Sequence, residues 1–209
     1  MELSRPLATV TPTLDGDVLA VLAGHVGPFT TGQLHRVLTR FSEEGIRKVL
    51  QRLTRQGVVL AERVGPAYSY RLNRNHLAAD PIVALASLQR TLLDRLERRL
   101  TGWAAPPVYA AVFGSAARGT STTDSDLDLL LVRADDAPAA AWEEQVSALA
   151  AAVTAWTGND TRPLEYTVSQ LAAARSEPVL RDVARDGLTV AGDRGWLTRQ
   201  LRNRARGHV

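Results

Sequence analysis

The sequence of 209 residues contains no cysteine, one methionine and one lysine, and aromatic residues make up only 5% of it. Without cysteine, the chain can form neither disulfides nor thiolate metal sites. No stretch approaches the roughly 20 consecutive apolar residues that a membrane helix needs. The first residues also lack the basic start and apolar run of a signal peptide. These absences predict a cytoplasmic protein that does not enter a membrane.

Hydrophobic residues make up 45% of the chain, which is enough to bury one large core or two small ones. The net charge of +3 is unevenly distributed. Residues 1–80 have an excess of three basic side chains, residues 197–209 have an excess of four, and the segment between them is acidic. Two basic ends favour a nucleic-acid partner.

One stretch in the acidic segment carries a distinctive pattern. Residues 108–113 are apolar and partly β-branched, which predicts a buried strand that ends at Gly114-Ser115. A polar stretch, residues 116–125, leads to a second apolar strand that opens with Asp126-Leu127-Asp128. Because side chains two apart share a face of a strand, Asp126 and Asp128 should point the same way, roughly 7 Å apart at Cα.

This pattern suits a phosphate ligand and a metal. A glycine lets backbone N–H groups approach an anion without a Cβ in the way. Two carboxylates on one face beside it suit Mg²⁺ or Mn²⁺ that carries a triphosphate. Alone, Asp-x-Asp usually marks a solvated strand start and Gly-Ser a turn, so the prediction depends on their combination.

Residues 108–132 resemble the nucleotidyltransferase superfamily that includes DNA polymerase beta, in particular its small bacterial members, the minimal nucleotidyltransferases. The shared signature is Gly114-Ser115, a gap of similar length, and Asp126-x-Asp128 at the start of the next strand. The resemblance spans roughly residues 104–195. It implies metal-dependent transfer of a nucleotide from a nucleoside triphosphate, by default ATP. It also implies that Asp126 and Asp128 hold the metal, and that the phosphates are bound by Gly114, Ser115, Arg118 and Ser125.

The family also uses a third carboxylate from a later strand, more often an aspartate. Residues 162–168 read as that strand, with Leu164, Tyr166 and Val168 on one face and Glu165 on the other. Glu165 is therefore the predicted third metal ligand, which would also take the proton from the acceptor hydroxyl. Asp160, in the preceding turn, is the second choice. The alternative for Glu165 is an exposed carboxylate without a role.

The N-terminal part shows a different pattern. Apolar spacing predicts helices over residues 14–24, from Thr30 or Thr31 to 38, and over 42–57. A hairpin should follow over 58–63 and 68–72 around a Gly-Pro turn. Three short helices and a hairpin resemble the winged helix-turn-helix of bacterial regulators over residues 13–75, which implies binding of double-stranded DNA.

The third of these helices has a basic outer face, which in that family enters the major groove. The side chains predicted to reach bases or phosphates lie on this helix and on the hairpin. They are Arg47, Lys48, Gln51, Arg52, Arg55, Arg63 and Arg71. The alternative is a solvated helix face in a protein-binding module, because charged outer faces are common on surface helices.

The predicted fold is α+β. Residues 1–80 form a winged helix-turn-helix domain, 81–103 a linker helix, 104–196 a nucleotidyltransferase domain with a small mixed sheet flanked by helices, and 197–209 a basic tail. The apolar stripe of the linker helix suits packing on its own chain, and it also suits a homodimer.

The sequence thus predicts a nucleotidyltransferase whose DNA-binding domain regulates its own promoter. The acceptor stays open among a protein, such as the toxin of a toxin–antitoxin pair, an RNA end and a small molecule. A rival reading is a transcription regulator whose transferase domain only binds nucleotide or is inactive, and a third is a protein-interaction module.

Overall fold

The computed structural model describes residues 1–202, which divide into two compact units. The N-terminal unit contains Glu2 and residues Ser4–Gln89, and the C-terminal unit contains Met1, Leu3 and the chain from Arg90 onward. Each unit has a hydrophobic core of its own.

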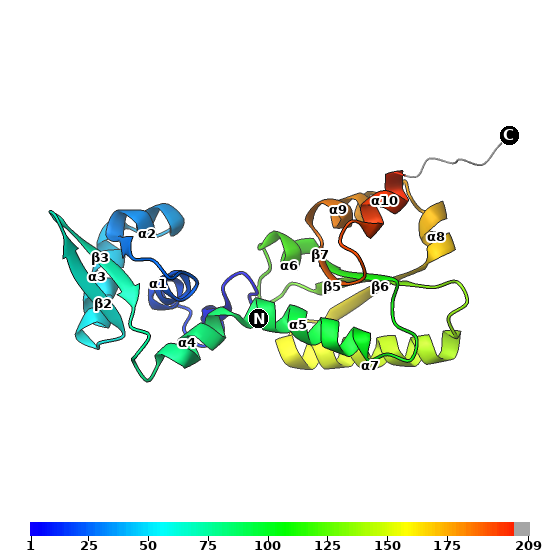
Figure 1. Ribbon diagram of the computed structural model, residues 1–209, viewed down its shortest axis with the longest axis horizontal. Helices are drawn as coiled ribbons and strands as arrows, with labels where there is room; N and C mark the ends of the chain where they lie inside the picture. The colour runs from blue at the N-terminus through cyan, green and yellow to red at the C-terminus, as the bar shows by residue number, and fades with distance from the viewer. Residues whose placement is uncertain (203–209) are drawn as a thin grey trace. The chain divides into compact units, whose positions relative to one another are not determined.

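The N-terminal unit consists of short helices and a three-stranded antiparallel sheet of order β1-β3-β2 (Figure 1). Its elements are η1 (Pro6–Thr9), α1 (Leu14–Ala23), β1 (Phe29–Thr30), α2 (Thr31–Val37), α3 (Glu43–Arg55), β2 (Val59–Val64), β3 (Ala67–Leu72) and α4 (Ala79–Ala86). The three predicted helices and the hairpin are present. The sequence did not predict β1, a strand of two residues that pairs with β3.

Side-chain hydrogen bonds cap the N-termini of α2 and α3. The Thr30 hydroxyl accepts a hydrogen bond from the Gln33 N–H at 3.2 Å, and the Gln33 side chain accepts one from the Thr30 N–H at 2.7 Å. The Ser42 hydroxyl accepts from the Gly45 N–H at 3.1 Å and starts α3. The inner face of α3 is buried as predicted, so its basic side chains face outward.

The predicted single linker helix is two helices, α4 and α5 (Leu88–Thr101). They separate at Ser87, whose N–H is shared between the carbonyls of Val83 and Ala84. The boundary between the units falls just after this break. The apolar stripe of α5 lies in the core of the C-terminal unit, where Leu92, Leu96 and Leu100 are buried, so packing on its own chain occupies it.

The C-terminal unit is a mixed sheet of order β6-β5-β4-β7 with helices on both faces (Figure 1). Besides α5, its elements are β4 (Tyr109–Phe113), α6 (Gly114–Arg118), β5 (Leu127–Arg133), α7 (Ala139–Thr157), β6 (Thr161–Thr167), α8 (Val168–Ala173), α9 (Pro178–Asp186), β7 (Leu188–Ala191) and α10 (Trp196–Arg202). Strand β4 pairs antiparallel with β5 and β7, whereas β5 and β6 are parallel. This is the small mixed sheet flanked by helices that the sequence predicts.

Both faces of this sheet are covered. On one face, Leu127, Leu129 and Leu131 of β5 pack with buried residues of α5 and α7. On the other face, Leu130 and Val132 pack with residues of α8, α9 and α10. Because neither face of β5 is open to solvent along its length, the strand is a nearly continuous apolar run.

The predicted basic tail lies only partly within the described residues. Arg199 and Arg202 belong to α10, and Arg199 forms an ion pair with Asp193 at 2.9 Å. Arg204 and Arg206 lie outside the described residues. Among residues 1–202, no helix combines the length and the apolar character needed to cross a membrane.

Candidate nucleotide site

The Gly-Ser and Asp-x-Asp segments meet at one end of the β4–β5 pair. Phe113, the last residue of β4, lies opposite Asp128 in the antiparallel register. Strand β4 ends before Gly114 as predicted, and Gly114 begins the short helix α6. Gly114 has φ of +69°, and a Cβ there would lie 2.2 Å from Oδ2 of Asp128. Only glycine allows the chain to turn so close to this carboxylate.

Asp126 and Asp128 are close enough to influence each other electrostatically. Partial burial raises the pKa of Asp128 above its ordinary value, and the negative charge of Asp126 raises it further. The positive charges of Arg162 and Arg118 act in the opposite direction and do not cancel this rise. The structure therefore brings the two predicted carboxylates together, and the pair keeps an excess of negative charge.

The loop before Asp126 is held by hydrogen bonds within the C-terminal unit. The Ser125 hydroxyl accepts from the Thr122 N–H at 2.9 Å. The side-chain amide of buried Asn159 donates to the Ser125 carbonyl at 2.7 Å, and its oxygen accepts from the Met1 ammonium at 2.7 Å. Ser125, predicted to bind phosphate, thus uses its hydroxyl to shape the loop.

Ser115 and Arg118, the other predicted phosphate ligands, lie on α6. Within residues 1–202, neither side chain makes a hydrogen bond or an ion pair. Arg118 is exposed, and its charge reaches both Asp128 and Asp186. Both side chains are therefore available to a ligand.

Glu165 does not join the acidic pair. In the parallel register it lies beside Leu131, whereas Asp128 lies beside Arg162, so Glu165 and Asp128 point to opposite faces of the sheet. The Glu165 carboxylate instead accepts a hydrogen bond from Nε1 of buried Trp142 on α7, at 2.6 Å. The predicted convergence of three carboxylates is therefore not found. Asp160, the second choice, is largely exposed, and its carbonyl accepts from the Leu127 N–H at 2.8 Å.

The strand position beside Asp128 is occupied by Arg162, which the sequence analysis did not single out. Nη1 of Arg162 lies 2.8 Å from Oδ2 of Asp126, and its Nε lies 3.5 Å from Oδ2 of Asp160. The side chain of Arg162 is 64% exposed and that of Asp126 is 33% exposed. A cation of the protein thus partly neutralises the acidic pair from the adjacent strand.

The chemistry of the pair fits a divalent cation bound together with a substrate. Among the described residues, no three His, Cys, Asp or Glu side chains form a metal cluster. Mg²⁺, however, is commonly held by one or two carboxylates and completed by water and substrate phosphates. Asp126 and Asp128 supply those carboxylates, and the pKa of Asp128 is raised first by burial and then by the charge of Asp126.

Residues 90–177 match the family model described as "Nucleotidyltransferase domain". This stretch is similar to nucleotidyltransferase domains. The match begins within α5 and ends just before α9, so it contains the acidic pair, α6 and β6. It assigns the enzyme class to the C-terminal unit, and it does not extend into the N-terminal unit.

Two solved structures are similar to part of the chain. One is described as a toxin–antitoxin with AMP-PNP, with 20% identity and a TM-score of 0.38. The other is a mutant of the MntA–HpeT toxin–antitoxin, with 18% identity and a TM-score of 0.38. Each alignment covers 52% of this chain and 80% of the other. A search of curated proteins finds no match.

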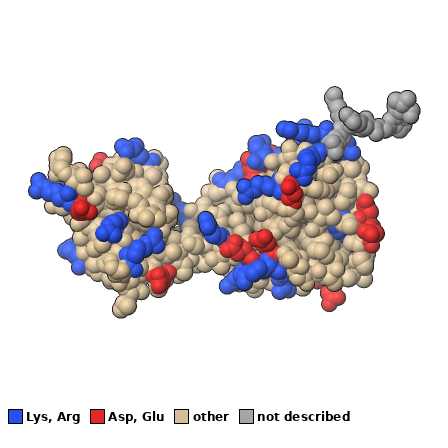
Figure 2. Space-filling view, viewed as in Figure 1, with Lys and Arg blue, Asp and Glu red and all other residues tan. Residues whose placement is uncertain are grey.

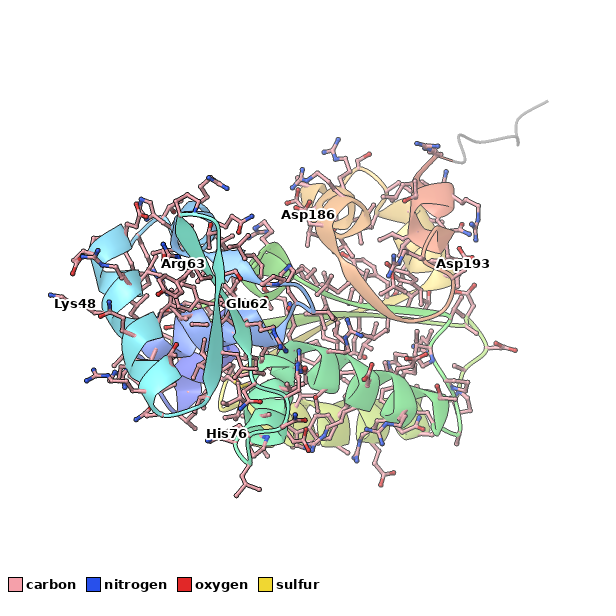
Figure 3. The ribbon with its side chains drawn as sticks, turned by 60° about the vertical axis from the view of Figure 1, so that its left-hand side comes forward. Lys48, Glu62, Arg63, His76, Asp186 and Asp193 are labelled. Carbon is pink, nitrogen blue, oxygen red and sulfur yellow. The ribbon has the colours of Figure 1, made fainter. Side chains whose placement is uncertain are left out.

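Apart from the nucleotidyltransferase domain, the N-terminal unit presents a basic surface on α3 and the hairpin. On the face shown in Figure 2, Lys and Arg side chains are spread over this unit. Lys48 points away from the unit on α3, and Arg63 lies on β2 (Figure 3). All seven predicted DNA-binding side chains are exposed.

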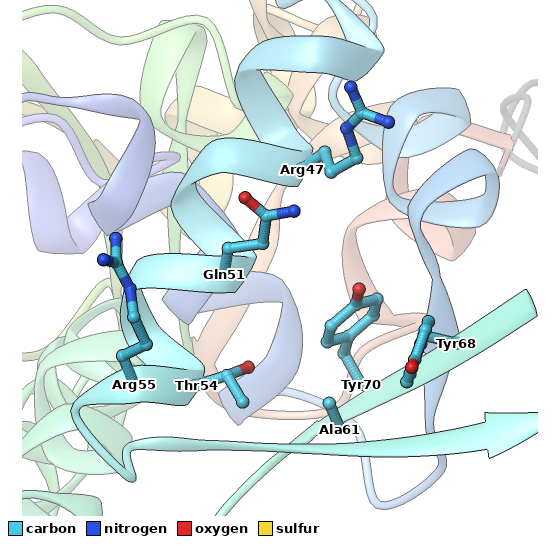
Figure 4. Close-up of a pocket in the computed structure, with 7 residues that line it drawn as sticks. All are labelled: Arg47, Gln51, Thr54, Arg55, Ala61, Tyr68 and Tyr70. Atoms are coloured by element: carbon cyan, nitrogen blue, oxygen red, sulfur yellow. The ribbon is translucent and has the colours of Figure 1, made fainter.

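A hollow of about 710 Å³ lies between α3 and the hairpin. Arg47, Gln51 and Arg55 line it from α3, and Tyr68 and Tyr70 line it from β3 (Figure 4). The two tyrosines were not predicted as functional residues. Their alternation with polar residues in 67–72 marks a strand, but gives no sign that they face α3.

Two of the predicted cations already have acidic partners. Arg52 forms an ion pair with Asp15 of α1, and Arg47 forms one with Glu44 one turn earlier on α3. Lys48 and Arg55 have no acidic partner among residues 1–202. The charge of α3 that is free to meet a polyanion therefore comes mainly from Lys48 and Arg55.

Proposed function

We propose that this protein transfers a nucleoside monophosphate, with ATP as the donor, to an acceptor in a reaction that depends on Mg²⁺ or Mn²⁺. The proposal is carried by one observation: Asp128 of the acidic pair lies against Gly114 within the stretch that matches the nucleotidyltransferase family model. When bound, the cation would neutralise charge on the triphosphate and on the atoms that exchange at the α-phosphorus.

The residues of the chain have distinct roles in this proposal. Asp126 and Asp128 would hold the cation. Gly114 keeps the backbone of α6 close to Asp128, while the Ser115 hydroxyl and the Arg118 guanidinium bind phosphate oxygens. The acceptor oxygen bonds to the α-phosphorus, the bond to the bridging oxygen breaks and pyrophosphate leaves, while the proton of the acceptor hydroxyl passes to solvent water. Because Glu165 lies on the other face of the sheet, it has no part in these steps.

Label transfer tests the proposal. Protein incubated with α-labelled ATP, Mg²⁺ and cell lysate should transfer label to protein, RNA or a small molecule, which also identifies the acceptor. The double variant Asp126→Asn with Asp128→Asn should lose at least about a hundredfold of this transfer, since removal of one charge-stabilising group typically costs that much. Unchanged labelling by the double variant would refute the assignment.

A second function is proposed for the N-terminal unit, namely binding of double-stranded DNA in the manner of a winged helix-turn-helix. Three helices, the sheet order β1-β3-β2 and the exposed cations of α3 and the hairpin support it. Together, the two proposals describe a transferase that controls its own gene.

One observation favours the rival function, a regulator whose transferase domain binds nucleotide without turnover. The position beside Asp128 on β6 holds Arg162 instead of a third carboxylate. Under this rival, the wild-type protein would bind Mg·ATP but transfer no label to any component of the lysate.

A further inference from the structure

The position of Arg162 is fixed by the sheet. Strands β5 and β6 are parallel and in register, with Asp128 beside Arg162 and Leu130 beside Leu164. Leu130 and Leu164 pack in the same apolar cluster, which shows that this row of side chains faces α8 and α9. The guanidinium of Arg162 therefore rises from the strand position nearest to the acidic pair and on the same face.

The guanidinium contacts one of the carboxylate oxygens to which a metal could bind. Nη1 of Arg162 contacts Oδ2 of Asp126 at 2.8 Å. A divalent cation at the acidic pair would lie within a few ångströms of this positive charge, and like charges at that distance repel strongly. A cation and the present Arg162–Asp126 contact are thus alternatives.

The ion pair between Arg162 and Asp126 can break at little cost in stability. Arg162 is 64% exposed, and exposed ion pairs contribute little to stability. A triphosphate brought to the site would offer Arg162 new anionic oxygens, with which a guanidinium forms strong charge-assisted hydrogen bonds. The long side chain can turn from Asp126 to a phosphate while its strand stays in place.

We propose that Arg162 competes with the divalent cation for Asp126 and is drawn away by the triphosphate, so that the site takes up metal and nucleotide together and resists metal alone. Arg162 is a positioning residue in this proposal, which rests on the proposed nucleotidyl transfer at the same site. The coupling is reciprocal: nucleotide tightens metal binding by the same factor by which metal tightens nucleotide binding.

Mn²⁺ titration by calorimetry, with and without a non-hydrolysable ATP analogue, measures this coupling without any turnover. Wild-type protein should bind Mn²⁺ weakly alone and much more tightly with the analogue. Arg162→Gln should bind Mn²⁺ alone about tenfold more tightly than wild type, which is within the usual range of coupling between sites. The effect of the analogue on Mn²⁺ affinity should shrink in the same variant.

Two further variants keep the result interpretable. Arg162→Lys preserves the positive charge and should behave more like wild type than Arg162→Gln does. Arg181→Gln removes an exposed arginine of α9. The guanidinium of Arg181 donates a hydrogen bond to the Ser176 carbonyl, so this variant should leave Mn²⁺ binding unchanged. Thermal melting of each variant checks that it is folded.

Wild-type Mn²⁺ affinity in Arg162→Gln, with the coupling to nucleotide intact, would overturn the inference and leave the proposed transfer standing. If wild-type protein bound no Mn²⁺ even with the analogue, the proposed function itself would fail, and the inference with it.

Discussion

At the scale of single residues, Asp128 stands out because its negative charge is unfavourable where it lies in the fold. Asp128 is partly buried beside Asp126, and both effects favour its protonated form. Groups of this kind often mark functional sites, where an arrangement suited to a ligand destabilises the protein without it. Gly114 belongs to the same arrangement, since any larger residue would meet the Asp128 carboxylate.

Replacement of Asp128 by asparagine is therefore expected to stabilise the metal-free protein at neutral pH. The pKa of Asp128 is higher in the folded than in the unfolded state, so its ionisation lowers stability as the pH rises through the folded pKa. The melting temperature of Asp128→Asn should exceed that of wild type at pH 7, and this advantage should shrink below the ordinary pKa of aspartate. A lower melting temperature at pH 7 would contradict this account, and Asp136→Asn, at an exposed turn residue, serves as the control.

At the scale of elements, β5 and β6 explain what the sequence could and could not predict. The strands, their apolar faces and the shared direction of Asp126 and Asp128 follow from composition and alternation. The residue of β6 that lies beside Asp128 cannot be predicted in this way. Both faces of β5 are buried, so its sequence does not show which face packs against which helices. Alternation in residues 162–168 favours Glu165 because it lies on the face opposite the apolar side chains, but the register places Arg162 beside Asp128 instead.

The N-terminal elements were easier to predict because α3 is buried on one side only. Its apolar and charged residues separate cleanly around the helix, and Ser42 marks its start. The ion pair between Arg52 and Asp15 depends on the packing of α1 against α3, which the sequence pattern does not predict. The same holds for the break at Ser87, since no proline or glycine interrupts the apolar stripe there.

The Trp142–Glu165 contact leads to a prediction about β6 and α7. Glu165→Ala should leave label transfer unchanged, because its carboxylate lies on the face opposite Asp128. It should lower stability by about 1–3 kcal/mol, since the Nε1–H of buried Trp142 loses its acceptor. Chemical denaturation of Glu165→Ala and Glu165→Gln, the latter keeping an acceptor, measures this difference. Loss of transfer in both variants would restore Glu165 as a site residue.

At the scale of the whole molecule, two units with separate cores carry two proposed activities. If the basic face of α3 binds DNA, Lys48→Ala with Arg55→Ala should weaken DNA binding. The slope of the logarithm of the binding constant against the logarithm of the salt concentration should also fall by about two, since about two phosphate contacts are lost. Label transfer should be unaffected, because the substituted side chains belong to a unit with a core of its own and share no partner with the acidic pair. Electrophoretic mobility shifts over a range of salt concentrations measure the first effect. Glu43→Ala with Glu62→Ala provides a charge control, and DNA retention equal to wild type in the lysine–arginine variant would contradict the proposal.

The central claim is that the acidic pair binds nucleotide through a divalent cation. Equilibrium dialysis of labelled α,β-methylene ATP against the full chain, in Mg²⁺ and in EDTA, tests it most directly. The account predicts binding in Mg²⁺ that is lost in EDTA and lost in Asp126→Asn with Asp128→Asn. Binding of equal strength in EDTA, or in the double variant, would contradict it.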